Sequence, residues 1–152
     1  MSVIIRPMVP ADAGIVASCA RPADIEEMHA CTGLPLVIVL QCGLQESLRA
    51  WVIEHDGLPL AAVGDTLAGF GVGVPWMVTT VHIEKSPRGF LRASKALMRE
   101  AMQRHYQLTN YVDARNGDAI RWLEWLGFKM EPAVPYGVSG LPFHKFQITR
   151  EV

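Results

Sequence analysis

The feature that most constrains the fold is a β-rich segment that runs directly into the clearest helix of the chain. Residues 74–83 are rich in β-branched side chains, which favour strands. Residues 87–105 follow as a helix in which Phe90, Leu97 and Ala101 fall on one face. We therefore expect a strand near the middle of a sheet and a long helix packed against one face of that sheet.

The rest of the chain alternates between helical and strand periodicity, without a repeat or a linker. The other predicted elements are a strand at 3–6, helices at 10–20 and 22–31, a hairpin of 51–54 and 60–64, a strand at 108–113, a helix at 117–126, and strands at 128–130 and 143–149. Residues 34–50 fit either a strand or a helix. Asp56 and Gly57 are typical of a tight hairpin turn, and Gly33 is typical of a helix C-terminus. We expect one domain over residues 1–152, α/β of the α+β type, with a mixed, mostly antiparallel twisted sheet flanked by helices.

The composition excludes several classes of protein. Half of the 152 residues are hydrophobic, 19% are charged, and the formal net charge is −1. A disordered chain would be less hydrophobic, and a nonspecific nucleic-acid-binding protein would be strongly basic. The longest apolar run, residues 34–40, is far below the roughly 20 residues of a membrane span. We therefore expect a cytoplasmic protein with neither nucleic-acid nor membrane partners.

The residue types that bind metals or form disulfides show no useful spacing. Cys19, Cys31 and Cys42 form neither an even disulfide set nor a Cys-x-x-Cys pair, so we expect free thiols in a reducing compartment. The histidines are scattered and contain no His-x-x-x-His pair. We expect no metal site.

The long helix at 87–105 carries a basic stripe. Arg88, Arg92, Lys95 and Arg99 are spaced by four, three and four residues, so all four project from one face. One interpretation is an anion site, because the free N–H groups at a helix N-terminus attract negative charge. The other is a solvated basic face, which is the commoner origin of such a stripe.

The helix at 117–126 begins with a good capping residue and carries one ring out of place. The Asn116 side chain can accept a hydrogen bond from the free N–H groups of the first turn. Trp125 falls off the apolar face, beside Arg121. Either the loop at 132–142 covers the indole, or the ring belongs to a partner surface. We predict Trp125 and Arg121 as interface residues.

The order of elements and two segments resemble the GNAT acetyltransferase superfamily. Arg88, Gly89 and Ala93 are similar to the family's Arg/Gln-x-x-Gly-x-Gly/Ala turn, whose N–H groups hold the pyrophosphate of acetyl-CoA. Residues 116–128 are similar to its Asn-x-x-Ala-Ile … Gly-Phe signature. The resemblance implies a GNAT-like domain, with Arg88, Gly89, Ala93 and Asn116 as the residues that would contact the cofactor.

Two positions depart from the family pattern. Leu91 stands where the phosphate turn has a glycine, and its side chain would crowd a phosphate. Leu123 stands where the family often has a tyrosine as general acid, and leucine cannot donate a proton. Glu84 is a possible base. We therefore expect no cofactor and leave the catalytic residues unknown, with acetyl-CoA as the cofactor if the protein is an enzyme.

A narrower and more diffuse likeness covers nearly the whole chain. Ile5-Arg6-Pro7, Asn110-Tyr111-Val112 and the ending Phe146-Gln147-Ile148-Thr149 are similar to small internal virion proteins of short-tailed phages. This resemblance implies other virion proteins, or further copies of the chain, as partners. It also implies a location in the host cytoplasm during assembly, or in the virion.

Three functions follow from these observations. The first, which we expect, is phage virion assembly or an internal structural role on an acetyltransferase-like scaffold without catalysis. The alternative is an acyl-CoA-dependent N-acetyltransferase that transfers an acetyl group to an amine. The third is a host binding module without enzymatic activity. Because function depends on the site rather than on the fold, Leu91, Leu123 and the binding of coenzyme A distinguish the first hypothesis from the second.

Overall fold

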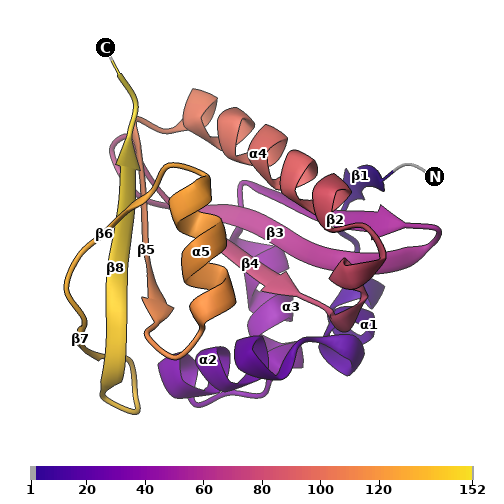
Figure 1. Cartoon of the computed structure of the whole chain (residues 1–152), viewed down its shortest axis with the longest axis horizontal. Coiled ribbons are helices and arrows are strands. Elements are labelled where there is room, and N and C mark those ends of the chain that lie inside the picture. The colour runs from indigo at the N-terminus through magenta and orange to yellow at the C-terminus, as the bar shows by residue number, and fades with distance from the viewer. Residues whose placement is uncertain (1–2, 152) are drawn as a thin grey trace.

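The structure is a computed structural model that describes residues 3–151. These residues form one eight-stranded sheet with helices packed against it (Figure 1). The strands are β1 (Val3–Pro7), β2 (Arg49–His55), β3 (Leu58–Gly69), β4 (Val72–Thr79), β5 (Gln107–Asp113), β6 (Lys129–Met130), β7 (Val134–Tyr136) and β8 (Leu141–Thr149). The helices are α1 (Ala11–Cys19), α2 (Pro22–Thr32), α3 (Leu36–Glu46), the short 3₁₀-helix η1 (Val81–Lys85), α4 (Pro87–Arg104) and α5 (Gly117–Trp125).

The sheet has the strand order β1-β2-β3-β4-β5-β8-β6, and β7 pairs with β8. All neighbouring strands are antiparallel except β4 and β5, which are parallel. A parallel pair needs a crossover connection, and α4 provides it. The predicted fold class is confirmed, with β4 in the middle of the sheet.

Two apolar layers cover the opposite faces of the central strands. Because side chains alternate along a strand, neighbouring residues of β2 and β3 enter different layers. Val52 and Ala62 pack in the layer that includes α1 and α3, whereas Ile53 and Ala61 pack in the layer that includes α4. The residues predicted for the buried face of α4 are all buried: Phe90, Ala93, Leu97 and Ala101.

Local signals also predicted several turns correctly. Asp56 and Gly57 both have positive φ, at 50° and 77°, as the tight turn between β2 and β3 requires. Gly33 ends α2 in the left-handed conformation, and its N–H donates to the carbonyl oxygen of His29. The Asn116 side chain caps α5 by accepting from the Ala119 N–H.

Three parts of the chain differ from the expected pattern. Within the segment 132–142, expected as a loop, residues Val134–Tyr136 form β7, which pairs with β8. Residues 81–83 were predicted as strand, but β4 ends at Thr79 and η1 follows, because the Thr80 hydroxyl accepts from the His82 N–H at 3.1 Å and starts a helical turn. The ambiguous segment 34–50 is divided between α3 and the start of β2. The helical form prevails because it buries Leu36 and Leu40 in the layer shared with α1.

Within residues 3–151, no single helix is long and apolar enough to cross a membrane; α2 and α3 pass that test only when taken together, across a bend of 74°.

Candidate functional site

The parallel strands β4 and β5 are joined at one end and separate toward the other. Their pairing is limited to Val72 with Gln107 and Gly73 with Leu108. Beyond these pairs, Asn110 of β5 still donates from Nδ2 to the carbonyl oxygen of Pro75, at 2.8 Å. The separation leaves a cleft of about 1080 Å³, including the part open to solvent.

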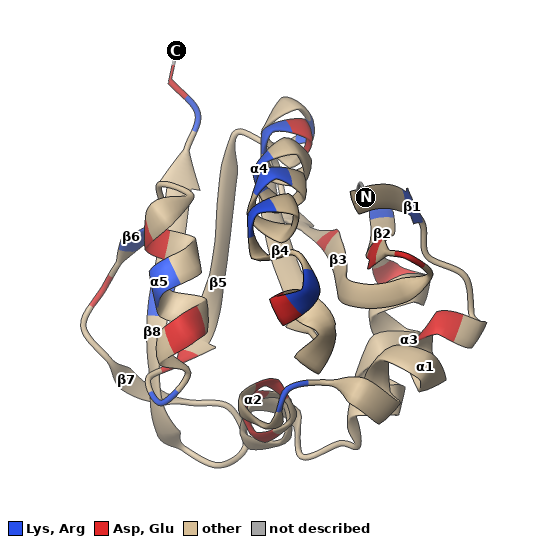
Figure 2. Cartoon of the chain, turned by 45° about the vertical axis from the view of Figure 1, so that its right-hand side comes forward, with Lys and Arg blue, Asp and Glu red and all other residues tan. Residues whose placement is uncertain are grey.

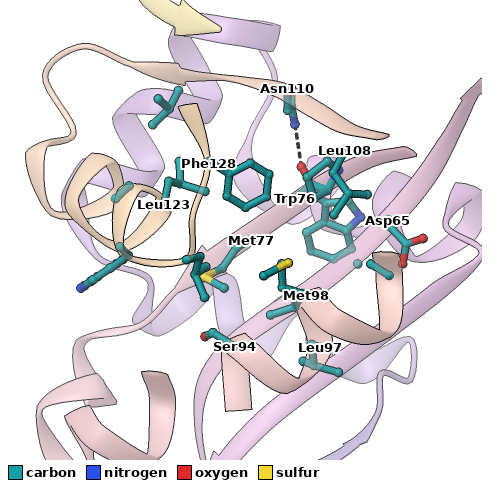
Figure 3. Close-up of a pocket in the computed structure, with 18 of the residues that line it drawn as sticks. Asp65, Trp76, Met77, Ser94, Leu97, Met98, Leu108, Asn110, Leu123 and Phe128 are labelled. Atoms are coloured by element: carbon teal, nitrogen blue, oxygen red, sulfur yellow. Dashed lines mark hydrogen bonds between the residues drawn. The ribbon is translucent and has the colours of Figure 1, made fainter. Parts of the chain in front are cut away.

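The walls of this cleft are largely apolar and aromatic (Figure 3). The cleft lies between β4, β5, α4 and α5, and α2 borders it at the wide end. The lining side chains include Trp51, Trp76, Met77, Phe90, Leu91, Leu97, Met98, Leu108, Tyr111, Trp122, Leu123, Leu126, Phe128 and Phe146. Such a wall favours the alkyl or aromatic part of a ligand, with a few polar groups to orient it.

A buried ionic network lies at the joined end of the strands. Asp65 of β3 accepts from Arg104 Nη2 at 2.6 Å, and its other oxygen lies 2.6 Å from His105 Nε2. Asp65 and His105 are both buried. The histidines showed no pattern in the sequence, because this contact joins residues 40 positions apart.

A second network joins α2 to the wide end of the cleft. Asp24 accepts from the Thr79 N–H at 2.7 Å, and Glu27 accepts from the Asp113 N–H at 2.9 Å. Asn116 donates from its single Nδ2 to both carboxylates, at 2.9 Å for Asp24 and 3.2 Å for Glu27. Thr79 and Asp113 are the last residues of β4 and β5. Two carboxylates of one helix therefore hold the ends of the two separated strands.

Glu27 is the most perturbed carboxyl group of this network. Its pKa is raised to about 7, chiefly by burial away from water and also by the negative charges of Asp24 and Asp113, although the hydrogen bonds from the Asp113 N–H and from Asn116 oppose the shift. The hydrogen bonds from the Asp113 N–H and from Asn116 both end on its Oε1. A carboxyl group that titrates near neutral pH in a cleft is a candidate for proton transfer.

Arg21 closes the network on the side of α5. Its guanidinium donates to Thr79 Oγ1 at 2.6 Å and to Asp118 at 3.2 Å, and it also pairs with Asp24 at 3.1 Å. The same group lies 4.7 Å from the centroid of the Trp122 ring, a cation–π distance. These contacts bridge the space between the end of β4 and α5.

No protein-family model and no curated protein sequence matches the chain. Solved structures match it closely in shape. The aminoglycoside acetyltransferase AAC(6')-Ib, in complex with coenzyme A, is 18% identical, with a TM-score of 0.70 over 98% of this chain and 95% of that one. An acetyltransferase of the GNAT family from Streptococcus pneumoniae is 15% identical, with a TM-score of 0.63 over 98% of this chain and 100% of that one. This chain has a GNAT-like fold.

A protein from Streptococcus mutans UA159 has the same fold, at 15% identity and a TM-score of 0.72 over 97% of this chain and 99% of its own. The resemblance to GNAT acetyltransferases is thus confirmed at the level of the fold. The narrower likeness to internal virion proteins is not shown by these comparisons. It stays a prediction.

On this GNAT scaffold, three of the predicted cofactor residues lie together and one lies apart. Arg88, Gly89 and Ala93 line a groove beside β1, on the side of α4 that faces Val3. Packing also requires a glycine at position 89, because a Cβ there would collide with Val3 and with Ser86 Oγ. The fourth residue, Asn116, is buried in the network at the end of the cleft.

The two positions that depart from the GNAT pattern both line the cleft. Leu91 and Leu123 contribute to its apolar wall, from α4 and α5 respectively. Glu84 lies exposed on η1 and is not among the residues that line the cleft. The groups with acid–base chemistry at the wide end are therefore Asp24 and Glu27. Their spacing of three residues on one helix was the available signal, but the sequence did not show that this face is buried.

The predicted interface residues lie on the outer side of α5. The Trp125 side chain is 52% exposed, so the loop at 132–142 does not hide it. Lys95 Nζ of α4 lies 5.3 Å from the centroid of the Trp125 ring. Arg121 is exposed and pairs with Asp118 on the same helix. The Trp125 ring is therefore in contact with the basic stripe of α4 through Lys95. The Lys and Arg residues of α4 are blue in Figure 2.

Metal-ligating residue types do not gather anywhere in the described chain. Within residues 3–151, no group of three or more His, Cys, Asp or Glu side chains could hold a metal ion. The cysteines are free, as expected: Cys19, Cys31 and Cys42.

Proposed function

We propose that this protein binds an acyl-CoA and transfers its acyl group to an amine. The observation that carries the proposal is the separation of β4 from β5, which opens an apolar cleft in the middle of a GNAT-like fold. AAC(6')-Ib, which shares this fold, has been solved with coenzyme A. The proposal therefore replaces the expectation of no cofactor.

The cleft and the start of α4 together fit an acyl-CoA in two respects. The apolar wall formed by Met77, Met98 and their neighbours suits the alkyl part of such a ligand. The first helical hydrogen bond of α4 runs from the Phe90 N–H to Ser86, so the N–H groups of Arg88 and Gly89 precede it and can face an anion. Arg88 adds a charge at the place where the phosphates would bind.

The basic residues at the start of α4 and along its basic stripe are free to bind anions. Among residues 3–151, no ion pair is formed by Lys85, Arg88, Arg92, Lys95 or Arg99. Leu91, near the start of α4, presents an apolar side chain to the cleft. Arg88 and the helix N-terminus are thus better placed than the cleft wall to hold the phosphates.

Glu27 is the residue best suited to handle the proton of the acceptor. A bound acyl-CoA supplies a thioester-activated acyl group. The amine nitrogen forms a bond to the acyl carbon, the carbon–sulfur bond breaks, and the amine loses a proton. A carboxylate whose pKa is about 7 can take that proton at neutral pH, whereas Leu123 can neither accept nor donate one.

Two measurements test the proposal together. Titration calorimetry with acetyl-CoA should give a dissociation constant in the micromolar range, which corresponds to about −8 kcal/mol. Release of the coenzyme A thiol should then depend on an added primary amine, and Glu27→Gln should lower that rate while acetyl-CoA still binds. Glu26→Gln, on the exposed face of the same helix, is the matched control and should leave the rate unchanged. Absence of binding at millimolar acetyl-CoA would rule the proposal out.

A second candidate function is assembly through a protein surface, without catalysis. The half-exposed Trp125 favours it, because large exposed rings are enriched where partners bind. The expected partners are other copies of the chain or other proteins of a virion. Leu91 and Leu123 agree with a cleft that no longer performs chemistry.

Trp125→Ala distinguishes this candidate from a merely structural role of the ring. If Trp125 is an interface residue, the change should reduce self-association or incorporation into particles and leave the melting temperature almost unchanged. Analytical ultracentrifugation measures the first quantity and thermal unfolding the second. Glu124→Ala, an exposed neighbour on α5, is the control. A lower melting temperature with unchanged association would contradict the interface role.

A further inference from the structure

Helix α2 lies at the bottom of the view in Figure 2, and its residues Asp24, Glu27 and Met28 line the wide end of the cleft. Each of the two separated strands ends in a backbone N–H that donates to a carboxylate of this helix. The Thr79 N–H, at the end of β4, bonds to Asp24, and the Asp113 N–H, at the end of β5, bonds to Glu27. The distance between the two strand ends is therefore set by one turn of α2.

A single amide group locks the two carboxylates to each other. Asn116 Nδ2 donates to Asp24 Oδ1 and Glu27 Oε1, and the Asn116 backbone starts α5. Thr79 adds a second bond to Asp24, from Oγ1 at 2.5 Å. All four side chains are buried. Movement of α2 would break these bonds together, because they share the same acceptors.

We propose that α2 is a proton-operated clasp, in which the protonation state of Glu27 decides how firmly the helix holds β4 and β5 at the wide end of the cleft. The clasp does not rest on acyl transfer, since it uses only contacts within the chain. It would control access to the cleft for whatever ligand binds there.

The charged and titratable groups around Glu27 determine the direction of the effect. On α2 they are Asp24, one turn before it, and Cys31, one turn after it; at the end of β5 they are Asp113 and Arg115. Arg21 and Asp118 lie beyond Asp24, and Tyr136 of β7 lies beside Cys31. The carboxylates next to Glu27 are thus Asp24 and Asp113, and each disfavours a further negative charge.

The clasp should loosen as pH rises from about 4.5 to about 7. In the closed state burial raises the pKa of Glu27 from 4.5 to about 7. In an open state water reaches the carboxyl group, and its pKa returns toward the ordinary value. The open state therefore binds fewer protons than the closed state within this interval, and opening becomes easier until the closed-state group has also ionised.

Amide hydrogen exchange of the full chain, without acyl-CoA or amine, tests the proposal. The reporters are the N–H groups of Thr79 and Asp113, which the clasp protects. After correction for the intrinsic pH dependence of exchange, their protection should fall roughly 10- to 300-fold between pH 4.5 and pH 8, as the pKa difference requires. Glu27→Gln should abolish this fall, since an amide keeps the acceptor oxygen and does not titrate.

The controls separate the clasp from general loss of stability. Glu26→Gln removes a charge from the exposed face of the same helix and should retain the full pH dependence of the parent chain. At each pH, the two reporters should exchange faster than the Leu108 N–H at the joined end of the strands, because the clasp opens without unfolding the whole chain. Constant protection in the parent chain, or an equal fall in Glu27→Gln, would overturn the clasp. Equal protection of Leu108 and the two reporters at every pH would show that they exchange only by global unfolding, and would also overturn the clasp.

Discussion

Gly73 of β4 lies directly against the imidazole ring of His105, with no room for a Cβ between them. This approach brings the first turn after α4 onto the joined end of β4 and β5. It also holds His105 Nε2 2.6 Å from Asp65. The glycine is thus required by packing at the point where the cleft begins.

We expect Gly73→Ala to destabilise the fold by about 1–3 kcal/mol, the usual cost of forcing an extra carbon into a packed site. The added methyl group would push the His105 ring away from Asp65. Gly69→Ala is the matched control, because a Cβ at Gly69 meets nothing within 4 Å. Urea unfolding measures the stability of both variants. Equal losses of unfolding free energy in the two variants would contradict the close contact between Gly73 and His105.

Leu97 tests the register of α4 on the sheet. The side chain is buried in the layer that also contains Ile53 and Leu60. Leu97→Ala should therefore cost about 2–5 kcal/mol of unfolding free energy. Leu67→Ala, at an exposed position of β3, should cost far less. A loss below about 0.5 kcal/mol at Leu97 in the same urea titration would show that the predicted buried face is not the real one.

Glu27 should make the stability of the whole protein depend on pH. Its folded pKa of about 7 lies above the ordinary 4.5, so the folded state binds more protons than the unfolded state between these values. Stability from this group is present below about pH 4.5 and is lost as pH rises toward 7. At pH 8, the free energy of unfolding of Glu27→Gln should be about 1–3 kcal/mol higher than that of the parent chain. Urea unfolding at pH 5 and pH 8 measures the difference, and an equal difference at both values would contradict the buried, titrating carboxyl group.

Arg88 should matter for acyl-CoA binding through charge. Arg88→Ala removes a cation from the start of α4, and we expect weaker acetyl-CoA binding, with a smaller dependence on salt. Arg99→Ala lies three turns further along the same stripe and should have a smaller effect. Titration calorimetry at two salt concentrations measures both. Equal losses in the two variants would indicate a general effect of net charge rather than a phosphate contact at the helix N-terminus.

The outer surface of the chain was partly predictable from local patterns. The exposed Trp125 was recognised because it breaks the apolar stripe of α5, and the side chain is indeed half exposed. The motif that contains Gly89 predicts a phosphate turn at this position. The structure adds a packing reason for it, the contact with Val3 of β1, which no local pattern contains because the two residues are 86 positions apart.

What the sequence determined by itself were the elements and their order. Periodicity places the buried face of α4, and residues with special backbone preferences place the turns at Asp56-Gly57 and Gly33. These signals are local, because hydrogen bonds within a turn and the alternation of side chains depend on neighbours in the chain. Tertiary structure alone decided the site. Asp24, Glu27, Thr79, Asp113 and Asn116 come from four separate elements or their ends, and the raised pKa of Glu27 arises only when packing removes them together from water.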